Sequence, residues 1–213
     1  MTPPVVAVLD HGSGNLRSAV RALTRAGATV RLTSDPTVAA TADGLVVPGV
    51  GAFAHCMAGL TEIGAVDLVR EWAAADKPLL GICVGFQLLF EAGHEHGTTT
   101  TGLGVLSGQV ERLTARRLPH MGWNTVAAGA GARLLTEPEH YYFVHSYGVH
   151  APDGLTRAGR PVVVHTTDHD GDTFVAAVES GRLLATQFHP EKSDDAGLGL
   201  LGRWLRTIEA PST

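Results

Sequence analysis

Short apolar segments alternate with amphipathic segments over the first ninety residues, and this alternation limits the possible folds more than any other feature. Residues 5–10 form a continuous apolar run typical of a strand buried on both faces, and three further strands are expected at 28–33, 44–49 and 77–82. Helical patterns lie between them at 15–27 and 65–76, and Ser34, Asp35 and Pro36 indicate the start of a short helix. Strands that alternate with helices predict βαβ units and a mostly parallel sheet, which is an α/β fold.

The second half of the chain is rich in strand-like segments that are separated by glycine turns. These segments are residues 102–113, 140–150, 161–168, 173–180 and 182–190. We expect antiparallel or mixed strands here that extend the central sheet. A closing helix is expected over 193–209, capped at Ser193. Its apolar face is expected to carry Leu198, Leu201, Leu205 and Ile208.

Composition restricts the class of protein. The chain has 213 residues, of which 44% are hydrophobic, and we expect one domain over residues 1–213. A net charge of −5 gives no indication of binding to nucleic acid or to an anionic membrane. No apolar run approaches the ~20 residues of a membrane span, and the first residues are interpreted as a strand rather than a signal peptide. Two cysteines without a disulfide framework indicate a cytoplasmic protein.

Several motifs could suggest other chemistry. The "GSGN" sequence after the first strand lacks the lysine and Ser/Thr of a phosphate-binding loop. The histidines of "HEH" at 94–96 and "HTTDH" at 165–169 have no matching ligand set, so we expect neither a metal nor a cofactor. Cys56 has no base beside it in the sequence and is interpreted as structural.

Cys83 stands in the pattern G-x-C-x-G, between Gly81 and Gly85, where an apolar run gives way to a helical pattern. The equivalent serine pattern places a nucleophile on a tight turn between a strand and a helix. The helix N-terminus would favour the thiolate, which is the reactive form. The alternative is a small buried cysteine, and the nucleophile is favoured over it. The apolar residues 88–90 are expected to be helix core.

A thiolate nucleophile requires a base with an orienting partner. His189 and Glu191 are two residues apart at the end of the last strand-like segment, so extended backbone would place both side chains on one side. The glycine-rich sequence "VPGVGAF" at 47–53 ends the third strand. Ligands bind at the carboxyl ends of the strands of such sheets, so this loop and Cys83 should face the same crevice.

Taken together, these segments resemble the class I (triad) glutamine amidotransferases. The matching segments are "GSGNLRS", "PGVGAF", "GICVGFQLLFE", "PHMGWN", "YYFVHSYG" and "QFHPEKS". They are most similar to the glutaminase subunits of imidazole glycerol phosphate synthase, an enzyme of histidine biosynthesis, and they run in family order from residue 12 to 193. The resemblance implies the flavodoxin-like class I glutamine amidotransferase fold.

The resemblance also implies a reaction. Cys83 would attack the carboxamide of L-glutamine, His189 would protonate the departing ammonia and then activate water, and Glu191 would orient His189. The ammonia would pass to a separate cyclase subunit, in a heterodimer, that makes imidazole glycerol phosphate and an aminoimidazole carboxamide ribotide (AICAR). The whole chain is used by the glutaminase fold, so the site that consumes ammonia is expected on another polypeptide.

Further roles follow only from the resemblance. The peptide N–H groups of Val50 and Val84 would form the oxyanion hole, with the Gly49–Val50 peptide rotated inward. Substrate-binding residues would be Gly51, Gln87, Glu95, His145, Ser146 and Tyr147. Residues facing the cyclase would be Asn15, Trp123, Tyr142 and Lys192. Gln87 would hold either the α-carboxylate or the α-amino end of glutamine, and Glu95 could instead be a solvated loop carboxylate.

Two other functions are kept open. The chain could be another triad amidotransferase, or a γ-glutamyl hydrolase, that acts alone. It could also be a non-catalytic partner protein on the same fold. The motifs at 48–53 and 119–124 argue against the first, and the intact triad argues against the second.

Overall fold

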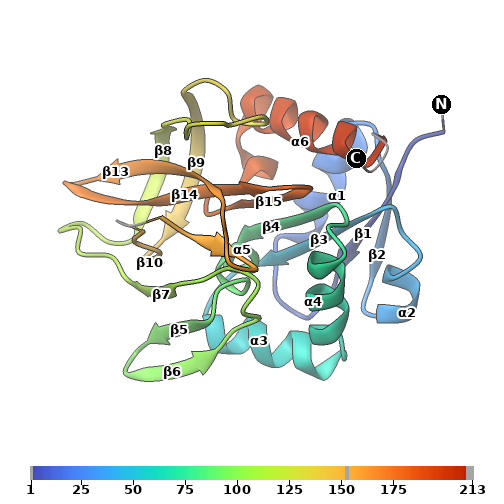
Figure 1. Cartoon of the computed structure of the whole chain (residues 1–213), viewed down its shortest axis with the longest axis horizontal. Helices are drawn as coiled ribbons and strands as arrows, with labels where there is room; N and C mark the ends of the chain where they lie inside the picture. The colour runs from blue at the N-terminus through green and yellow to red at the C-terminus, as the bar shows by residue number, and fades with distance from the viewer. Residues whose placement is uncertain (1, 152–153, 210–213) are drawn as a thin grey trace.

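A seven-stranded sheet forms the centre of the part of the chain that this computed structural model describes, residues 2–151 and 154–209. Its strand order is β13-β14-β15-β4-β3-β1-β2 (Figure 1). The parallel strands are β1 (Val5–Leu9), β2 (Thr29–Thr33), β3 (Gly44–Gly49), β4 (Leu79–Cys83) and β15 (Leu183–Thr186). β14 (Asp172–Ser180) and β13 (Val163–His169) continue the sheet as antiparallel strands. The predicted α/β fold with a mostly parallel sheet is confirmed.

Helices cover both faces of this sheet (Figure 1). α1 (Leu16–Arg25) and α6 (Asp194–Glu209) lie on one face, and α3 (Phe53–Glu62) and α4 (Val66–Ala74) lie on the other. α2 (Pro36–Ala39) begins where predicted, because the Asp35 carboxylate accepts a hydrogen bond from the Thr37 N–H at 2.8 Å. α3 was not predicted from the sequence. No capping side chain marks its start after Ala52, so it lacks the usual signal of a helix N-terminus.

The second half of the chain only partly follows the prediction. The segments at 161–168 and 173–180 extend the central sheet, but those at 102–113 and 140–150 do not. A separate four-stranded sheet contains β10 (Tyr147–Gly148), β7 (Gln109–Arg112), β5 (Ala92–Glu95) and β6 (Thr98–Thr101). Two antiparallel pairs are β8 (His120–Val126) with β9 (Glu139–His145), and β11 (Thr156–Arg157) with β12 (Arg160–Pro161). The chain leaves β9 at Ser146, whose carbonyl accepts from the Leu113 N–H and so joins the smaller sheet.

Two predicted helical features are corrected. Residues 88–90 are buried, but they follow the one-turn helix α5 (Val84–Gln87) as tight turns. The Leu88 N–H is still bonded four residues back, whereas those of Leu89 and Phe90 are bonded three residues back. In α6, Leu201 and Leu205 are buried as predicted, but Leu198 is only half-buried. Leu200 and Trp204 are also buried, so the apolar face is wider than the predicted stripe. Ser193 precedes this helix as predicted, but its hydroxyl donates to the His189 carbonyl at 2.6 Å.

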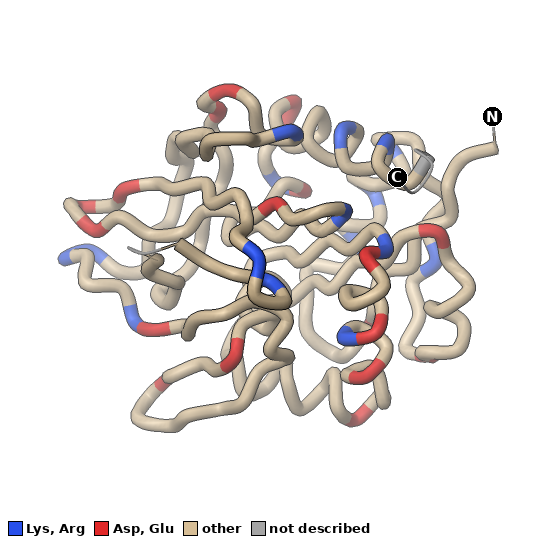
Figure 2. The backbone as a smooth tube through the Cα atoms, in the orientation of Figure 1, with Lys and Arg blue, Asp and Glu red and all other residues tan. Residues whose placement is uncertain are grey.

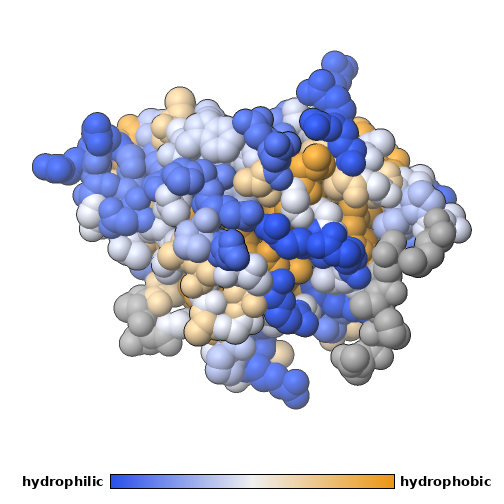
Figure 3. All heavy atoms as spheres, turned by 90° about the horizontal axis from the view of Figure 1, so that it is seen from above, coloured by the Kyte–Doolittle hydropathy of each residue, from blue (hydrophilic) through white to orange (hydrophobic). Residues whose placement is uncertain are grey.

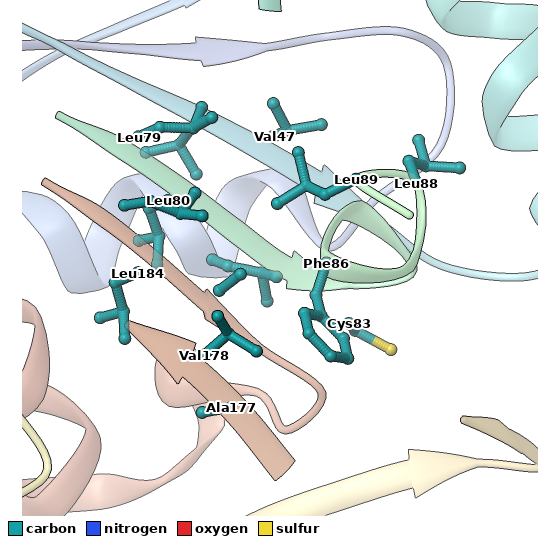
Figure 4. Close-up of a cluster of buried hydrophobic side chains, with 14 of the residues drawn as sticks. Val47, Leu79, Leu80, Cys83, Phe86, Leu88, Leu89, Ala177, Val178 and Leu184 are labelled. Atoms are coloured by element: carbon teal, nitrogen blue, oxygen red, sulfur yellow. The ribbon is translucent and has the colours of Figure 1, made fainter. Parts of the chain in front are cut away.

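The core lies between the central sheet and its helices. β3 and β4 are buried along their whole length, as continuous apolar runs predict. Leu79, Leu80 and Phe86 are among the side chains of the cluster in Figure 4. Each such burial contributes about 1.5–3 kcal/mol. Cys83 belongs to the same cluster, but its sulfur points away from the neighbouring aliphatic side chains (Figure 4).

The surface carries charges of both signs. Lys and Arg residues are interspersed with Asp and Glu residues along the chain (Figure 2). Seen from above, hydrophilic side chains cover much of the molecule, with apolar side chains visible between them (Figure 3). Within residues 2–151 and 154–209, no helix combines the length and apolar character required to cross a membrane.

A buried carboxylate ties the segment before β9 to the central sheet. Glu179 in β14 accepts hydrogen bonds from the N–H groups of Arg133, Leu134 and Leu135 at 2.9–3.1 Å, and it is 3% exposed. His165 Nε2 lies 3.1 Å from the same carboxylate. Burial would raise the pKa of Glu179, but the contact with His165 and the hydrogen bonds from the N–H groups hold it below its ordinary value.

Glu179→Ala is expected to lower the free energy of unfolding by about 3 kcal/mol or more, because three backbone donors lose their partner. Urea denaturation measures this, and Glu111→Ala on the exposed side of β7 is the control, with a change within about 0.5 kcal/mol. The pKa of Glu179 is lower in the folded chain than in the unfolded chain. Its stabilising contribution is therefore present above pH 4.5 and is lost as the pH falls through the folded pKa. The variant should approach the wild type at acidic pH, and equal stability at pH 7 would contradict the prediction.

Candidate active site

The turn at Cys83 has the predicted form, with β4 ending at Cys83 and α5 beginning at Val84. Cys83 has φ of +55° and ψ of −113°, an uncommon conformation for a residue with a side chain. Gly85 is required by close packing, because a Cβ there would lie 1.9 Å from the Val47 carbonyl oxygen. Strained backbone of this kind costs about 1–3 kcal/mol and is found mainly at functional sites.

A cavity of about 290 Å³ opens beside this turn. Its lining residues are Val50, Gly51, Cys83, Val84, Gln87, Glu95, Val144, His145, Ser146, Tyr147, His189 and Lys192. The candidate nucleophile, the candidate base and every residue expected to bind substrate therefore line one cavity. These residues come from both halves of the chain, and the carboxyl ends of β3 and β4 supply the first of them, as predicted for a doubly wound sheet.

His189 and Glu191 form a buried pair. The Nδ1–H of His189 donates to Glu191 Oε1 at 2.8 Å, and both side chains are at most 2% exposed. The predicted backbone is corrected here. β15 ends at Thr186, and Glu191 lies in a short 3₁₀-helix (Pro190–Lys192), so the contact arises from a helical turn rather than from the pleat of a strand. Asn15 donates to the same carboxylate oxygen at 3.5 Å.

The protonation of His189 reflects these contacts. Burial lowers the pKa of His189, but Cys83 and Glu191 outweigh burial and raise it to about 9. Nε2 of His189 is buried and makes no hydrogen bond to the described residues. This nitrogen is therefore the ring atom that is free to exchange a proton within the cavity.

Gln187 is a further residue of this site that was not predicted from the sequence. It is fully buried, and its Nε2 donates to the Cys83 sulfur at 3.8 Å. Its Oε1 accepts from Gln87 Nε2 at 2.9 Å. The one available signal was its position two residues before His189, and that spacing alone does not show that its side chain reaches the sulfur.

Glu95 is buried rather than solvated. It ends β5, is 8% exposed, and accepts a hydrogen bond from the Phe53 N–H at 2.9 Å. The alternative of a solvated loop carboxylate is wrong, because the N-terminus of α3 holds this carboxylate at the cavity.

The loop at 48–51 is held from the segment that follows β1. His11 Nε2 donates to the Pro48 carbonyl at 2.7 Å, and the Ser13 hydroxyl donates to the Val50 carbonyl. The sulfur of Cys56 lies 3.4 Å from the same Val50 oxygen. Burial raises the pKa of Cys56, which disfavours the thiolate. The structural interpretation of Cys56 is consistent with these contacts.

Three of the residues expected to face a partner lie together. Trp123 in β8 pairs with Tyr142 in β9, with ring centroids 6.2 Å apart, and Lys192 Nζ lies 5.8 Å from the Tyr142 ring. Trp123 is 50% exposed, and Met121 beside it is 62% exposed. The fourth of these residues, Asn15, contacts Glu191.

The histidine motifs have other partners. His165 faces Glu179, and His94 bonds to Thr99 and Gln109. Among residues 2–151 and 154–209, no three His, Cys, Asp or Glu side chains are grouped so that they could hold a metal ion.

Comparison with known proteins defines the family. The family model "Glutamine amidotransferase class-I" matches residues 7–198. The chain is 54% identical to the imidazole glycerol phosphate synthase subunit HisH of Corynebacterium diphtheriae, over 94% of this chain and 97% of that protein. It is 52% identical to the protein of the same name from Cutibacterium acnes, over 98% of this chain and 100% of that protein.

Solved structures show the same fold. A crystal structure of a glutamine amidotransferase has a TM-score of 0.73 at 24% identity and covers 96% of this chain, with 99% of that chain covered. The structure of PurLQS from Thermotoga maritima has a TM-score of 0.67 at 19% identity and covers 98% of both chains. The predicted class I fold is confirmed. The chain belongs to the class I glutamine amidotransferase family and, within it, to the HisH subunits of imidazole glycerol phosphate synthase.

Proposed function

We propose that this chain hydrolyses L-glutamine at Cys83 and delivers the ammonia to a cyclase subunit, which makes imidazole glycerol phosphate and AICAR. Family membership supports this glutaminase function over a stand-alone hydrolase or a non-catalytic protein. The observation that carries the assignment of residues is the shared cavity of Cys83 and the buried His189–Glu191 pair.

The first half of the reaction forms a thioester. The Cys83 thiolate attacks the carboxamide carbon of glutamine, and the carbonyl oxygen becomes an oxyanion. The Val84 N–H at the start of α5 is one donor to that oxyanion, and the Val50 N–H, turned inward, is the other. The intermediate collapses as the C–N bond breaks, and the Nε2–H of His189 protonates the leaving nitrogen to give ammonia.

The second half regenerates the thiolate. Neutral His189 takes a proton from water at Nε2, and the resulting hydroxide attacks the thioester carbonyl. The C–S bond breaks, glutamate leaves, and the thiolate is again paired with the imidazolium. Glu191 holds the Nδ1–H throughout, so that Nε2 faces the reacting atoms.

The contacts of Gln87 favour one of its two possible roles. Both hydrogens of its amide are used, one by the Tyr147 carbonyl at 2.8 Å and one by Gln187. Only Oε1 remains for the substrate, and it is an acceptor. We therefore assign Gln87 and Glu95 to the α-ammonium group of glutamine, and the backbone at 145–147 to its α-carboxylate.

The partner surface is proposed to be the patch formed by Trp123, Tyr142 and Lys192. Exposed aromatic side chains with a basic neighbour are typical of interface centres. Lys192 also lines the cavity, so a cyclase docked on this patch would lie close to the site where ammonia is released.

Glutaminase assays of the chain alone and with the cyclase subunit test this proposal. We expect low activity for the chain alone and a rise of about 10²–10³-fold in kcat with the cyclase, because that is the effect of one oxyanion donor. High activity of the free chain would contradict the dependence on the partner, and no glutamate release from the complex would contradict the function.

A further inference from the structure

We propose that His120 and Asn124, which lie outside the cavity lining, are positioning residues for glutamine binding and act through His145 on the Tyr147 carbonyl. This inference rests on the proposed function of the cavity. It is carried by a relay of four groups joined by hydrogen bonds, Asn124, His120, His145 and the Tyr147 carbonyl, which we call the hydrogen-bond relay. The relay runs from β8 to the substrate side of the cavity, and the structure determines every donor and acceptor in it.

The hydrogen-bond relay begins at Asn124, whose amide orientation is determined by two backbone groups. Its Oδ1 accepts from the Thr125 N–H at 2.8 Å, and its Nδ2 donates to the Asp168 carbonyl at 2.8 Å. The second hydrogen of Nδ2 points to His120 Nε2 at 3.2 Å. Because Asn124 can only donate at this contact, His120 Nε2 must accept.

The two histidines transmit this orientation. With Nε2 as acceptor, neutral His120 carries its proton on Nδ1, which lies 3.2 Å from His145 Nε2. His145 therefore accepts at Nε2 and donates from Nδ1 to the Tyr147 carbonyl at 2.8 Å. The carbonyl can only accept, so both ends of the hydrogen-bond relay require the same direction of donation, from Asn124 towards Tyr147.

A proton added to either ring would place two donors face to face. Burial lowers the pKa of His145 to about 3. Burial and the neighbouring His169 likewise lower the pKa of His120 to about 4, against an opposing effect of Asp170. His120 is 3% exposed and stacks between Phe143 and His169, with ring centroids 4.8 Å and 4.1 Å away. Both rings are thus neutral and fixed in place at neutral pH.

The Tyr147 carbonyl connects the hydrogen-bond relay to the substrate-binding residues. It accepts from both His145 and Gln87, so its two lone pairs are occupied. Gln87 in turn bonds to Gln187, which reaches the Cys83 sulfur. Loss of the donor at His120 would free His145 to rotate, release the Tyr147 carbonyl, and alter both Gln87 and the backbone that receives the α-carboxylate.

Three variants in complex with the cyclase test the inference. His120→Ala removes the donor and should raise KM for glutamine about tenfold with little change in kcat, the effect of one lost buried hydrogen bond. His120→Asn places an amide N–H where Nδ1 was, and should restore KM to within about threefold of the wild type. Asn124→Asp replaces the donor by an acceptor at constant shape, and should raise KM as His120→Ala does. His55→Ala, an exposed histidine of α3, is the control.

An NMR measurement tests the direction of the hydrogen-bond relay without relying on activity. In ¹⁵N-histidine-labelled protein, His120 and His145 should both be neutral Nδ1–H tautomers at pH 7, and Asn124→Asp should change the tautomer or charge of His120. Nε2–H tautomers or charged rings in the wild type would overturn the inference. Unchanged KM in both His120→Ala and Asn124→Asp would also overturn it, whereas no glutamine turnover by the wild-type complex would instead remove the proposed function.

Discussion

Cys83→Ala and Cys83→Ser are expected to lose glutamine-dependent turnover by about 10⁴-fold or more in kcat, because no other group in the cavity can form the thioester. The substitutions keep a side chain at φ of +55°, so the strain of the turn is unchanged. Glutamate release by the complex with the cyclase measures the loss. Synthesis of imidazole glycerol phosphate from added ammonia should continue, since it does not require the sulfur.

Comparison of glutamine-dependent with ammonia-dependent synthesis shows whether Cys83 acts in catalysis or in folding. Equal loss of glutamine-dependent and ammonia-dependent synthesis would place Cys83 in folding or docking rather than in amide cleavage. Labelling gives a second readout, because the chain has two cysteines and Cys56 is fully buried. Iodoacetamide should modify the wild type and Cys56→Ser once, and should not modify Cys83→Ser.

The parallel strands of the first ninety residues and the helices α1, α2 and α4 were predictable because local and global signals agree there, whereas α3 carries no such signal. Continuous apolar runs became the buried strands β1, β3 and β4, and Asp35 with Pro36 marked the start of α2. The smaller sheet was not predictable, because β5 and β6 are short and polar and are defined by their partners rather than by an apolar pattern. The organisation as a single domain stays a prediction.

The candidate site was predictable to the extent that each residue lies in a motif with its own chemistry. Cys83 was found through the glycines around it, and His189 through its carboxylate. The reason given for that pair was wrong, since a 3₁₀-helix makes the contact. Gln187 and Ser13 were missed because their roles depend on tertiary contacts, with the Cys83 sulfur and with the Val50 carbonyl.

Glu191→Gln is expected to lower kcat for glutamine by roughly 10²–10⁴-fold, which is the range for the loss of the carboxylate behind a catalytic imidazole. The substitution keeps the shape of a side chain that is 2% exposed but removes its charge, so the imidazolium formed with the thiolate loses its partner. The amide can also present its NH₂ to Nδ1, which would place the ring proton on Nε2 and remove the base from the second half of the reaction.

The titration of His189 distinguishes the loss of the Glu191 carboxylate from a general disturbance of the site. Glu191 contributes to raising the pKa of His189 to about 9 by favouring the charged ring. The titration midpoint of His189 must therefore fall when the carboxylate is removed. NMR titration of the His189 ring, with and without Glu191→Gln, measures the shift. Asp195→Asn, an exposed acid in the first turn of α6, removes one negative charge nearby and should leave both kcat and the midpoint unchanged. A Glu191→Gln variant with a kcat within about threefold of the wild type would show that the imidazole is oriented without this carboxylate, because a positioned catalytic base contributes about 10²–10⁴-fold.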